Sequence, residues 1–506
     1  MDHPGGPDHS PWGPPALVET HSALIILYGD QAHKVRKPLD LGFLDNSTVE
    51  ARAEQSRREV ELNSRLAPDV YTGVLEVRGP DGEVIDHVVR MRRLPGHRSL
   101  AALVASRVGR TSASRHPDLA AGVCEVARQV TGLHSVSPRS AEVDAVGHPS
   151  AVAGLWEESL EHLRRLRVGQ RAHDAVEHIG TLAADYLLGR TALLEERIAA
   201  GRIVDGHGDL LAADVYLTED GPRVIDCLEF DDRLRYGDAV LDVAFLAMDL
   251  DRLGARDLAV VFLRSYRDAS GDDAPSSLAH HYIAYRALVR AKVTAIRAEQ
   301  AADGGGTDAV RATELLSSAV DSLLRGRVRL VLVGGVSGSG KSTLAQPLAG
   351  ALGAELVRSD VVRGEVLAGD DRYSPEAIGR VYAEMLDRAS ELLARGRSVV
   401  LDATWLEPRR RVEAQTVAVD AHSELVEISC TAPRDELVRR IAERARAGTD
   451  PSEATAEVLD AQVADLVPWP EAIEVDTARL DARDADAVQR WAERELGPLP
   501  WAWPHP

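Results

Sequence analysis

Residues 328–344 read VRLVLVGGVSGSGKSTL, and they decide the fold of the C-terminal part of the chain. The apolar, β-branched start of this stretch is typical of a strand buried in a parallel sheet. The next residues fit the motif G-x-x-x-x-G-K-[ST], with Gly335, Gly340, Lys341 and Ser342 at its fixed positions. The helical pattern that follows completes the context that this motif requires. We therefore predict a phosphate-binding P-loop, the Walker A motif of nucleotide-binding proteins.

The chemistry of the loop predicts how it meets a nucleotide. Backbone N–H groups of the glycine-rich turn and the positive end of the next helix surround phosphate oxygens. Lys341 is expected to reach the β- and γ-phosphates, and Ser342 to place its hydroxyl on Mg²⁺. ATP and Mg²⁺ are therefore the predicted cofactors. The predicted nucleotide-binding residues of this loop are Gly335, Val336, Ser337, Gly338, Ser339, Gly340, Lys341, Ser342 and Thr343.

Lysine is rare in this chain, which makes each lysine informative. Of the 59 basic side chains only four are lysine, namely Lys34, Lys37, Lys292 and Lys341. Arginine and lysine are not interchangeable at a phosphate, where a compact ammonium group is needed. Lysines in a chain that otherwise uses arginine are therefore enriched at such positions, although chance survival is the alternative for any one of them.

Two further segments place carboxylates where the parallel sheet is expected to bind ligands. RSDVVRG carries Asp360 and Arg363 after the second predicted strand, and VVLDATW puts Asp402 at the end of another. Ligands of open parallel sheets bind at the carboxyl ends of the strands. Asp402 is predicted to hold Mg²⁺, and the alternative for Asp360 is that it only caps the next helix.

An arginine-rich helix follows in RDELVRRIAERARAGTD, residues 434–450. Its guanidinium groups, of which we select Arg440 and Arg444, are predicted to form a lid that meets the transferring phosphoryl group. The alternative is an ordinary solvated helix face.

Composition and pattern divide the chain into domains and exclude some classes of protein. A length of 506 residues favours two or three domains. We predict a disordered tail over residues 1–18, one domain over 19–325, and an α/β domain with alternating strands and helices over 326–506.

The net charge of −21 disfavours general binding of nucleic acid or anionic membranes. No apolar run approaches 18 residues, and no signal peptide is apparent. Three widely spaced cysteines favour a reducing cytoplasm.

A second set of acidic residues lies in the N-terminal part. HGDLLAADV (207–215) and VIDCLEF (224–230) each follow a predicted strand, and they space Asp209, Asp214 and Asp226 by 5 and 12 residues. The protein-kinase catalytic loop has the same logic, with a base, a metal ligand five residues on, and a second metal-binding Asp one hairpin later. We therefore predict Asp209 as a base and Asp214 and Asp226 as Mg²⁺ ligands.

The P-loop part resembles a group of small kinases. Residues 328–466 are similar to P-loop kinases of the gluconate-kinase, polynucleotide-kinase and zeta-toxin type. In that group an S-D-x-x-R element, like residues 359–363, binds the acceptor. The resemblance implies that Asp360 is a catalytic base, that Arg363 binds substrate, and that the reaction is phosphoryl transfer to a hydroxyl or at least ATP hydrolysis.

The N-terminal part resembles a different family. HGDL…ID…EF, continued by RYGDAVLDVAFLAMDL, is similar to the aminoglycoside phosphotransferase and choline-kinase-like family. The whole chain looks like a bacterial two-domain family that adds a C-terminal P-loop ATPase or kinase domain. The resemblance implies an α+β protein-kinase-like N-terminal domain followed by an α/β P-loop domain with a parallel sheet. It implies that Lys34 contacts the α/β-phosphates and is oriented by Glu59. Lys37 is the alternative to Lys34.

This sequence departs from the family pattern at two places. The loop usually runs H-G-D-L-H-x-x-N, whereas here Leu211 and Asp214 replace the His and the Asn. Asp is a competent Mg²⁺ ligand, but it adds a full negative charge beside a polyanion. The glycine-rich loop of protein kinases is also absent between the first strands, where only Gly29 occurs. His207 is expected to brace the loop, and His134 to pack in the core.

The favoured hypothesis is a cytoplasmic, bifunctional ATP-dependent kinase that phosphorylates hydroxyl groups of small molecules. In the alternative, the N-terminal domain is a pseudokinase that binds a ligand or partner, controlled by or coupled to a P-loop ATPase or kinase. A third hypothesis, drug resistance through aminoglycoside phosphorylation, rests on fold analogy alone. The acceptor of either domain and the oligomeric state stay open.

Overall fold

The computed structural model describes residues 14–20, 22–40, 45–108, 118–166, 169–300, 305–367, 374–447 and 456–503. The chain forms two compact units. Unit 1 consists of residues 1–148 and 197–273, and unit 2 of residues 149–196 and 274–506. None of the division points between the units falls at residues 325 and 326. The domain boundary predicted there stays a prediction.

Unit 1 begins with a five-stranded antiparallel sheet in the order β1-β2-β3-β5-β4. The sheet contains two hairpins, β2-β3 and β4-β5. The first strand pairs with β2 and overlaps the expected disordered tail, so that prediction is wrong for residues 16–18; residues 1–13 lie outside the described part of the chain. The strands are β1 (Ala16–Glu19), β2 (Ala23–Tyr28), β3 (Gln31–Arg36), β4 (Tyr71–Arg78) and β5 (Val84–Arg92).

One helix covers this sheet. Helix α1 (Val49–Asn63) begins after Thr48, whose side chain caps it by accepting a hydrogen bond from the backbone N–H of Ala51. It packs against β4 and β5. Apolar residues of β3, β4 and β5 and of the segment after α1 form the core below it, with Val89 fully buried. This packing fixes both the sheet and the helix that carry Lys34 and Glu59.

The rest of unit 1 is helical, with two small sheets. The sequence predicted two strands here, whereas the structure has four short ones, paired as β6-β9 and β7-β8. Strand β8 ends at Val224, so the segment that carries Asp226 follows a strand, as expected. The elements are α2 (Leu100–Val108), α3 (Leu119–Ser135), α4 (Ala141–Ala145), β6 (Ile203–Asp205), β7 (Val215–Thr218), β8 (Gly221–Val224), β9 (Tyr236–Asp238), α8 (Ala239–Arg252) and α9 (Arg256–Ser270), with 3₁₀ turns η1 (Gly96–Arg98) and η2 (Asp232–Leu234).

Unit 2 contains a group of four long helices that pack side by side. Helix α10 packs on α11 and α5, and α6 packs on α5 and α11. The chain passes from unit 2 to unit 1 within α7 (Thr191–Ala199). The four helices are α5 (Pro149–Arg165), α6 (Gln170–Leu188), α10 (Ser276–Gln300) and α11 (Gly306–Arg325).

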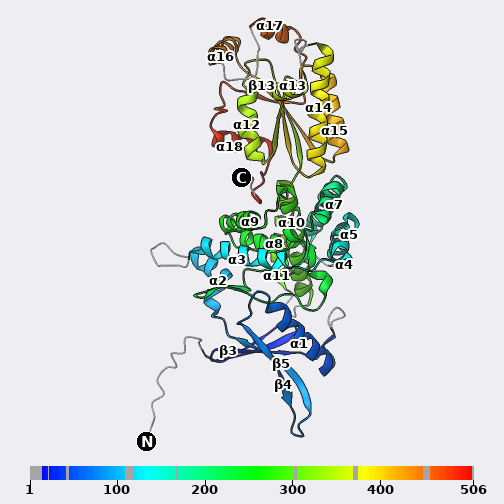
Figure 1. The fold of residues 1–506 in the computed structure, drawn as a ribbon, viewed down its shortest axis with the longest axis vertical. Helices are drawn as coiled ribbons and strands as arrows, with labels where there is room; N and C mark the ends of the chain where they lie inside the picture. The colour runs from blue at the N-terminus through cyan, green and yellow to red at the C-terminus, as the bar shows by residue number, and fades with distance from the viewer. Residues whose placement is uncertain are drawn as a thin grey trace. The chain divides into compact units, whose positions relative to one another are not determined.

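The second part of unit 2 is a five-stranded parallel sheet in the order β11-β12-β10-β13-β14. Its central strand β10 is buried along its whole length, as the apolar run predicted. Helices α12 and α18 lie on one face and α14 and α15 on the other (Figure 1). The strands are β10 (Arg329–Gly334), β11 (Glu355–Arg358), β12 (Val399–Asp402), β13 (Glu424–Thr431) and β14 (Ile473–Asp476), and the helices are α12 (Lys341–Leu352), α13 (Ser359–Val366), α14 (Pro375–Ala394), α15 (Pro408–Asp420), α16 (Arg434–Ala447), α17 (Ala456–Ala464) and α18 (Ala485–Leu496).

The register of this sheet gathers three strand ends. Val333 of β10 pairs with Asp402 of β12, and Asp402 pairs with Arg358 of β11. All three strands therefore finish at one edge, where the glycine-rich loop leaves β10. Within the residues that the structure describes, no helix is long and apolar enough to cross a membrane.

Candidate active sites

The first site is built around Lys34 on β3. Its Nζ lies 2.8 Å from Oε1 of Glu59, on α1, and 3.5 Å from Oδ1 of Asp226. Lys37 is occupied elsewhere, because its Nζ lies 2.5 Å from Oε1 of Glu19. The structure thus brings Lys34, Glu59 and Asp226 together and leaves the alternative Lys37 outside this cluster.

An unpredicted arginine completes the cluster. Nη2 of Arg36 lies 2.6 Å from Oε2 of Glu59 and 2.9 Å from Oε1 of Glu229, three residues beyond Asp226. The Arg36 and Glu59 side chains are each 1% exposed. Burial alone would lower the pKa of Lys34, but the surrounding carboxylates outweigh it and hold this pKa well above its usual value. Lys34 therefore stays charged, and Arg36 ties the helix carrying Glu59 to the segment carrying Asp226.

Replacing Arg36 with methionine is expected to lower the free energy of unfolding by about 3 kcal/mol, because buried carboxylates lose their counter-charge. Urea unfolding of the full-length chain measures this change. The control is Arg57→Met, since Arg57 is 62% exposed and pairs only with an exposed Glu54 at 3.5 Å. The control is expected to change stability by less than about 0.5 kcal/mol. Equal changes in the free energy of unfolding for the two substitutions would show that the buried cluster contributes no more to stability than an exposed ion pair.

A buried carboxylate holds the backbone of the loop that carries Asp209. Asp242, on α8, accepts hydrogen bonds from the backbone N–H of His207 (2.9 Å) and of Gly208 (2.8 Å). Nε2 of the His134 ring lies 3.0 Å from the same carboxylate. Burial works against the charged form, but these donors hold the pKa of Asp242 well below its usual value. The sequence analysis missed Asp242; the signal was an acidic residue inside the otherwise apolar run 239–248.

His207 itself acts on the backbone. Its ring is fully buried, and Nε2 lies 3.1 Å from the carbonyl oxygen of Ile225, to which it donates. Burial lowers the pKa of His207 and keeps the ring neutral. A neutral ring that holds a carbonyl next to Asp226 is the contact expected of a bracing residue.

The two predicted metal ligands of unit 1 flank one hairpin. The N–H of Ile225 donates to the carbonyl of Asp214 at 3.0 Å, which ties the two segments together. Asp226 has a left-handed backbone conformation with φ 63°, and its side chain is 55% exposed. The described residues contain no group of three or more His, Cys, Asp or Glu side chains that could hold a metal ion. Two carboxylates still fit Mg²⁺, which usually takes one or two of them together with phosphate oxygens and water.

The second site is the loop between β10 and α12. Gly335 and Gly338 have φ angles of 138° and 81°. A Cβ atom would lie 2.5 Å from the Cys430 carbonyl oxygen at Gly335 and 2.7 Å from the Leu437 carbonyl oxygen at Gly338. Both positions therefore require glycine for conformation and for space. Helix α12 begins at Lys341, so its N-terminal end points toward the loop, as the motif requires.

Asp402 lies beside this loop and is 3% exposed. Its Oδ2 accepts a hydrogen bond from Nε of Arg358 at 3.3 Å, whereas its buried Oδ1 has no hydrogen-bond partner within the described chain. Burial raises the pKa of Asp402, an effect opposed by the Lys341 ammonium group and the Ser342 hydroxyl. Lys341, Ser342 and Asp402 thus lie together, and the orphaned Oδ1 fits a ligand of Mg²⁺. Arg358 is a residue that the sequence analysis missed.

Asp360 and Arg363 form an ion pair within α13, with Nη1 of Arg363 2.5 Å from Oδ1 of Asp360. Helix α13 begins at Ser359 and its cap position is Arg358. The alternative in which Asp360 caps this helix is therefore wrong. The pair puts a carboxylate and a guanidinium group side by side, next to the strand end that carries Arg358.

The two predicted lid arginines differ in their contacts. Arg440 donates to Oγ1 of Thr477 (2.8 Å), to the carbonyl of Thr477 (3.1 Å) and to the carbonyl of Gly338 (3.4 Å). These contacts hold the backbone of the glycine-rich loop. Nη2 of Arg444 is buried and has no hydrogen-bond partner in the described part of the chain. Neither contact pattern tests the lid, which stays a prediction.

Family models match both parts of the chain. A model described as "Phosphotransferase enzyme family" matches residues 48–280, and one described as "AAA domain" matches residues 330–468. Among curated proteins, the uncharacterized proteins Rv2004c of Mycobacterium tuberculosis and Mb2027c of Mycobacterium bovis are each 40% identical over 471 residues. The match covers 91% of this chain and 92% of each relative.

Solved structures resemble the two parts separately. A choline/ethanolamine kinase family protein from Mesorhizobium loti is 16% identical, with a TM-score of 0.37, and the match covers 63% of this chain and 95% of that one. The APS kinase of Mycobacterium tuberculosis is 23% identical, with a TM-score of 0.26, and the match covers 33% of this chain and 98% of that one.

Proposed function

Because this chain belongs to the bacterial two-domain family that joins an aminoglycoside-phosphotransferase-like domain to a P-loop kinase domain, we propose that both domains transfer phosphoryl groups from ATP·Mg²⁺ to small-molecule hydroxyls. The observation that carries the proposal is a charged cluster in each unit. Lys34 lies with Glu59 and Asp226 in unit 1, and Lys341 lies with Ser342 and Asp402 in unit 2. Each cluster combines a lysine for phosphates with carboxylates for a metal ion.

In unit 1, Asp209 is the proposed base. Its carboxylate accepts the proton of the acceptor hydroxyl while that oxygen bonds to the γ-phosphorus and the bond to the β–γ bridging oxygen breaks, leaving ADP. Lys34, oriented by Glu59, holds the α/β-phosphates. Asp214 and Asp226 are the proposed ligands of Mg²⁺, which when bound offsets the charge of the phosphates.

In unit 2, Asp360 is the proposed base and Arg363 the acceptor-binding group. Their ion pair supports this assignment, because one acceptor molecule is able to contact both side chains. The glycine-rich loop and Lys341 hold the phosphates, and Ser342 and Asp402 hold the metal ion. Arg440 and Arg444 are proposed to stabilise the transferring group from α16.

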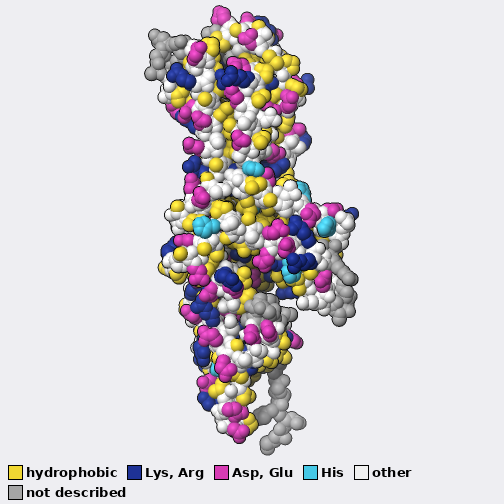
Figure 2. All heavy atoms as spheres, turned by 90° about the vertical axis from the view of Figure 1, so that its right-hand side faces the viewer, with side chains coloured by type: hydrophobic (Ala, Val, Ile, Leu, Met, Phe, Trp, Pro, Cys, Tyr) yellow, Lys and Arg dark blue, Asp and Glu magenta, His cyan; other side chains and the backbone are white. Residues whose placement is uncertain are grey.

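Surface charge and cysteine chemistry support small-molecule acceptors and a cytoplasmic location. On the face drawn in Figure 2, basic and acidic side chains lie intermixed, an arrangement that suits no extended polyanion. Cys124, Cys227 and Cys430 are all free thiols, the form that a reducing cytoplasm maintains.

The test is ATP turnover by the full-length chain across a panel of sugars, aminoglycosides and nucleosides. The Lys341→Ala and Asp209→Ala chains are each expected to lose the activity toward one class of acceptor and to keep the other. If neither substitution changes turnover with any acceptor, both site assignments are wrong.

A second candidate function follows from the replacements at Leu211 and Asp214. Here unit 1 is a pseudokinase that binds nucleotide without transfer, and the P-loop domain is the only enzyme. Calorimetric titration of the full-length Lys341→Ala chain with Mg·ATP separates the two functions. Binding without turnover favours the pseudokinase, and turnover excludes it.

A further inference from the structure

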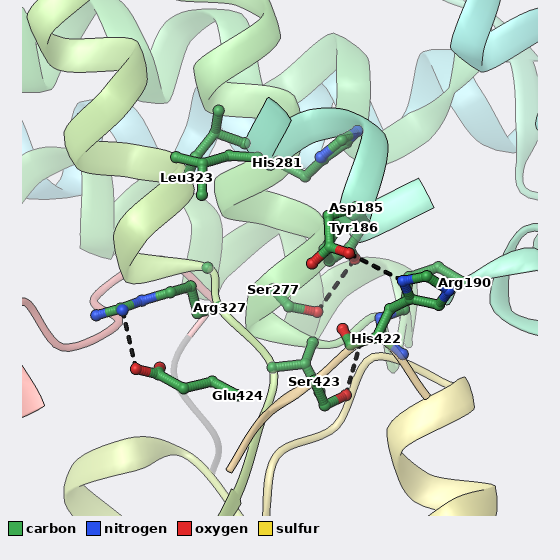
Figure 3. A pocket seen from close by; sticks show the side chains of 13 residues that line it. Asp185, Tyr186, Arg190, Ser277, His281, Leu323, Arg327, His422, Ser423 and Glu424 are labelled. Carbon is green, nitrogen blue, oxygen red and sulfur yellow. Dashed lines mark hydrogen bonds and ion pairs between the residues drawn. The ribbon is translucent and has the colours of Figure 1, made fainter. Parts of the chain in front are cut away.

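Unit 2 contains a cavity of about 190 Å³ that the proposed reactions do not use (Figure 3). It is lined by residues of α6, α10 and α11 and by the segments that lead into β10 and β13. The glycine-rich loop leaves the other end of β10. The cavity therefore lies at the edge of the sheet opposite the P-loop and is separate from the nucleotide site.

A buried arginine on the wall of this cavity forms no ion pair with any described carboxylate. Arg190 is 0% exposed. Its Nη1 donates to the carbonyls of Gly189 and Leu393, and its Nη2 donates to the His422 carbonyl (3.1 Å) and to Oγ of Ser423 (3.0 Å). All these acceptors are neutral, and within the described residues no ion pair joins Arg190 to a carboxylate. Its Nε is buried and has no hydrogen-bond partner there. A buried charge without a partner is costly, so this wall favours an anion.

A second donor without a partner lines the same cavity. The buried His281 ring accepts a hydrogen bond at Nε2 from the Trp156 indole N–H at 3.0 Å. Burial lowers the pKa of His281 to about 3, so the ring is neutral and its proton lies on Nδ1. Nδ1 is buried and has no hydrogen-bond partner in the described part of the chain. The ring stacks on Tyr186, with 4.4 Å between centroids, which fixes its orientation.

Two acidic side chains line the cavity, and they differ in their partners. Glu424 lies 3.0 Å from Nη1 of Arg327 and 2.8 Å from Nε of Arg329. Asp185 lies 2.9 Å from Nδ1 of His422, and Figure 3 draws both the Arg327 and the His422 contacts. Glu424 is therefore neutralised by two arginines, whereas the exposed Asp185 acts on Arg190 electrostatically without forming an ion pair with it.

We propose that this cavity binds a small oxyanion, a phosphate or a carboxylate group, with Arg190 as its counter-charge and Nε of Arg190 and Nδ1 of His281 as its donors. Two features fit this ligand. The volume exceeds that of several water molecules, which occupy about 30 Å³ each in the liquid. Helix α10 begins at Ser276, and Ser277 on its first turn lines the cavity, so the positive end of the helix favours the same charge. Bound anion also stabilises unit 2, because Arg190 holds backbone carbonyls at the end of α14 and in the segment that leads into β13.

The test uses the full-length Lys341→Ala chain, in which the P-loop no longer competes for anions. Inorganic phosphate and malonate are titrated by calorimetry, and the thermal midpoint is followed in parallel. Saturable binding of one anion per chain and a rise of the thermal midpoint are expected for at least one of the two anions. The anion that binds more tightly shows whether the cavity prefers a phosphate or a carboxylate group. Absence of saturable binding of both overturns the proposal, because the cavity then holds only water.

Variants locate the bound anion. Leu323→Trp fills the cavity and leaves its charges in place, and His281→Phe removes the Nδ1 donor but keeps a stacked ring. Leu323→Trp is expected to abolish binding, and His281→Phe to weaken it about tenfold. Arg395→Gln is the control, since this half-exposed arginine pairs with Glu196 away from the cavity and is expected to leave binding unchanged. Unchanged binding in His281→Phe overturns the proposal, even if Leu323→Trp fails to fold.

Discussion

The Lys341→Ala chain is expected to lose P-loop-dependent ATP turnover by about 10³-fold, the cost of removing one preorganised charge from a phosphoryl-transfer site. The ammonium group of Lys341 lies close enough to the buried Asp402 to counter the rise in the pKa of that carboxyl. Without it the γ-phosphate meets a buried carboxylate with less positive charge beside it. The rate should be measured in an Asp209→Asn background, so that turnover in unit 1 does not contribute.

Lys292→Ala is the matched control for this experiment. Lys292 is another lysine of unit 2, and its Nζ donates to Oγ of Ser159 at 3.2 Å, within the helical part. Its removal is expected to leave ATP turnover within about twofold of the parent chain, since it meets no predicted phosphate. If the Lys341→Ala chain turned over ATP as fast as the Lys292→Ala chain, the P-loop would have no part in the reaction.

The Asp209→Asn substitution is expected to lower the turnover of unit 1 by about 10²- to 10⁴-fold, the usual range for loss of a general base. It is measured in the Lys341→Ala background. The KM for ATP is expected to change little, because the proposed phosphate contacts belong to Lys34. This split between turnover and KM distinguishes loss of a base from loss of the fold, which would change both.

The control here is Asp268→Asn, at an aspartate that is 62% exposed and pairs only with Arg267. It is expected to leave both constants unchanged. A Lys341→Ala parent without measurable turnover for any acceptor would contradict the bifunctional proposal and favour the pseudokinase.

Local patterns predicted much of this fold. The apolar run into Gly335 predicted a buried central strand and a phosphate-binding turn, and the structure has both. The cap that Thr48 provides is of the same local kind, because capping depends on residues within one helical turn. The strands β7 and β9 were missed because three or four residues carry too little periodicity to be read.

Long-range contacts could not be predicted in the same way. Arg36 meets Glu229, which lies 193 residues further along the chain, and nothing in the pattern near either residue indicates the other. The cavity beside Arg190 escaped the sequence analysis for the same reason, since its walls come from four separate segments. Asp242 was open to detection, because a carboxylate within an apolar helix needs donors, but the donors themselves were not predictable.

The left-handed backbone at Asp226 has a consequence for how this position evolves. A non-glycine residue with φ near 63° is strained by about 1 kcal/mol or more, whereas glycine adopts the same conformation without that strain. Selection for folding alone would therefore favour glycine there. The aspartate at this position therefore gives up stability for a carboxylate.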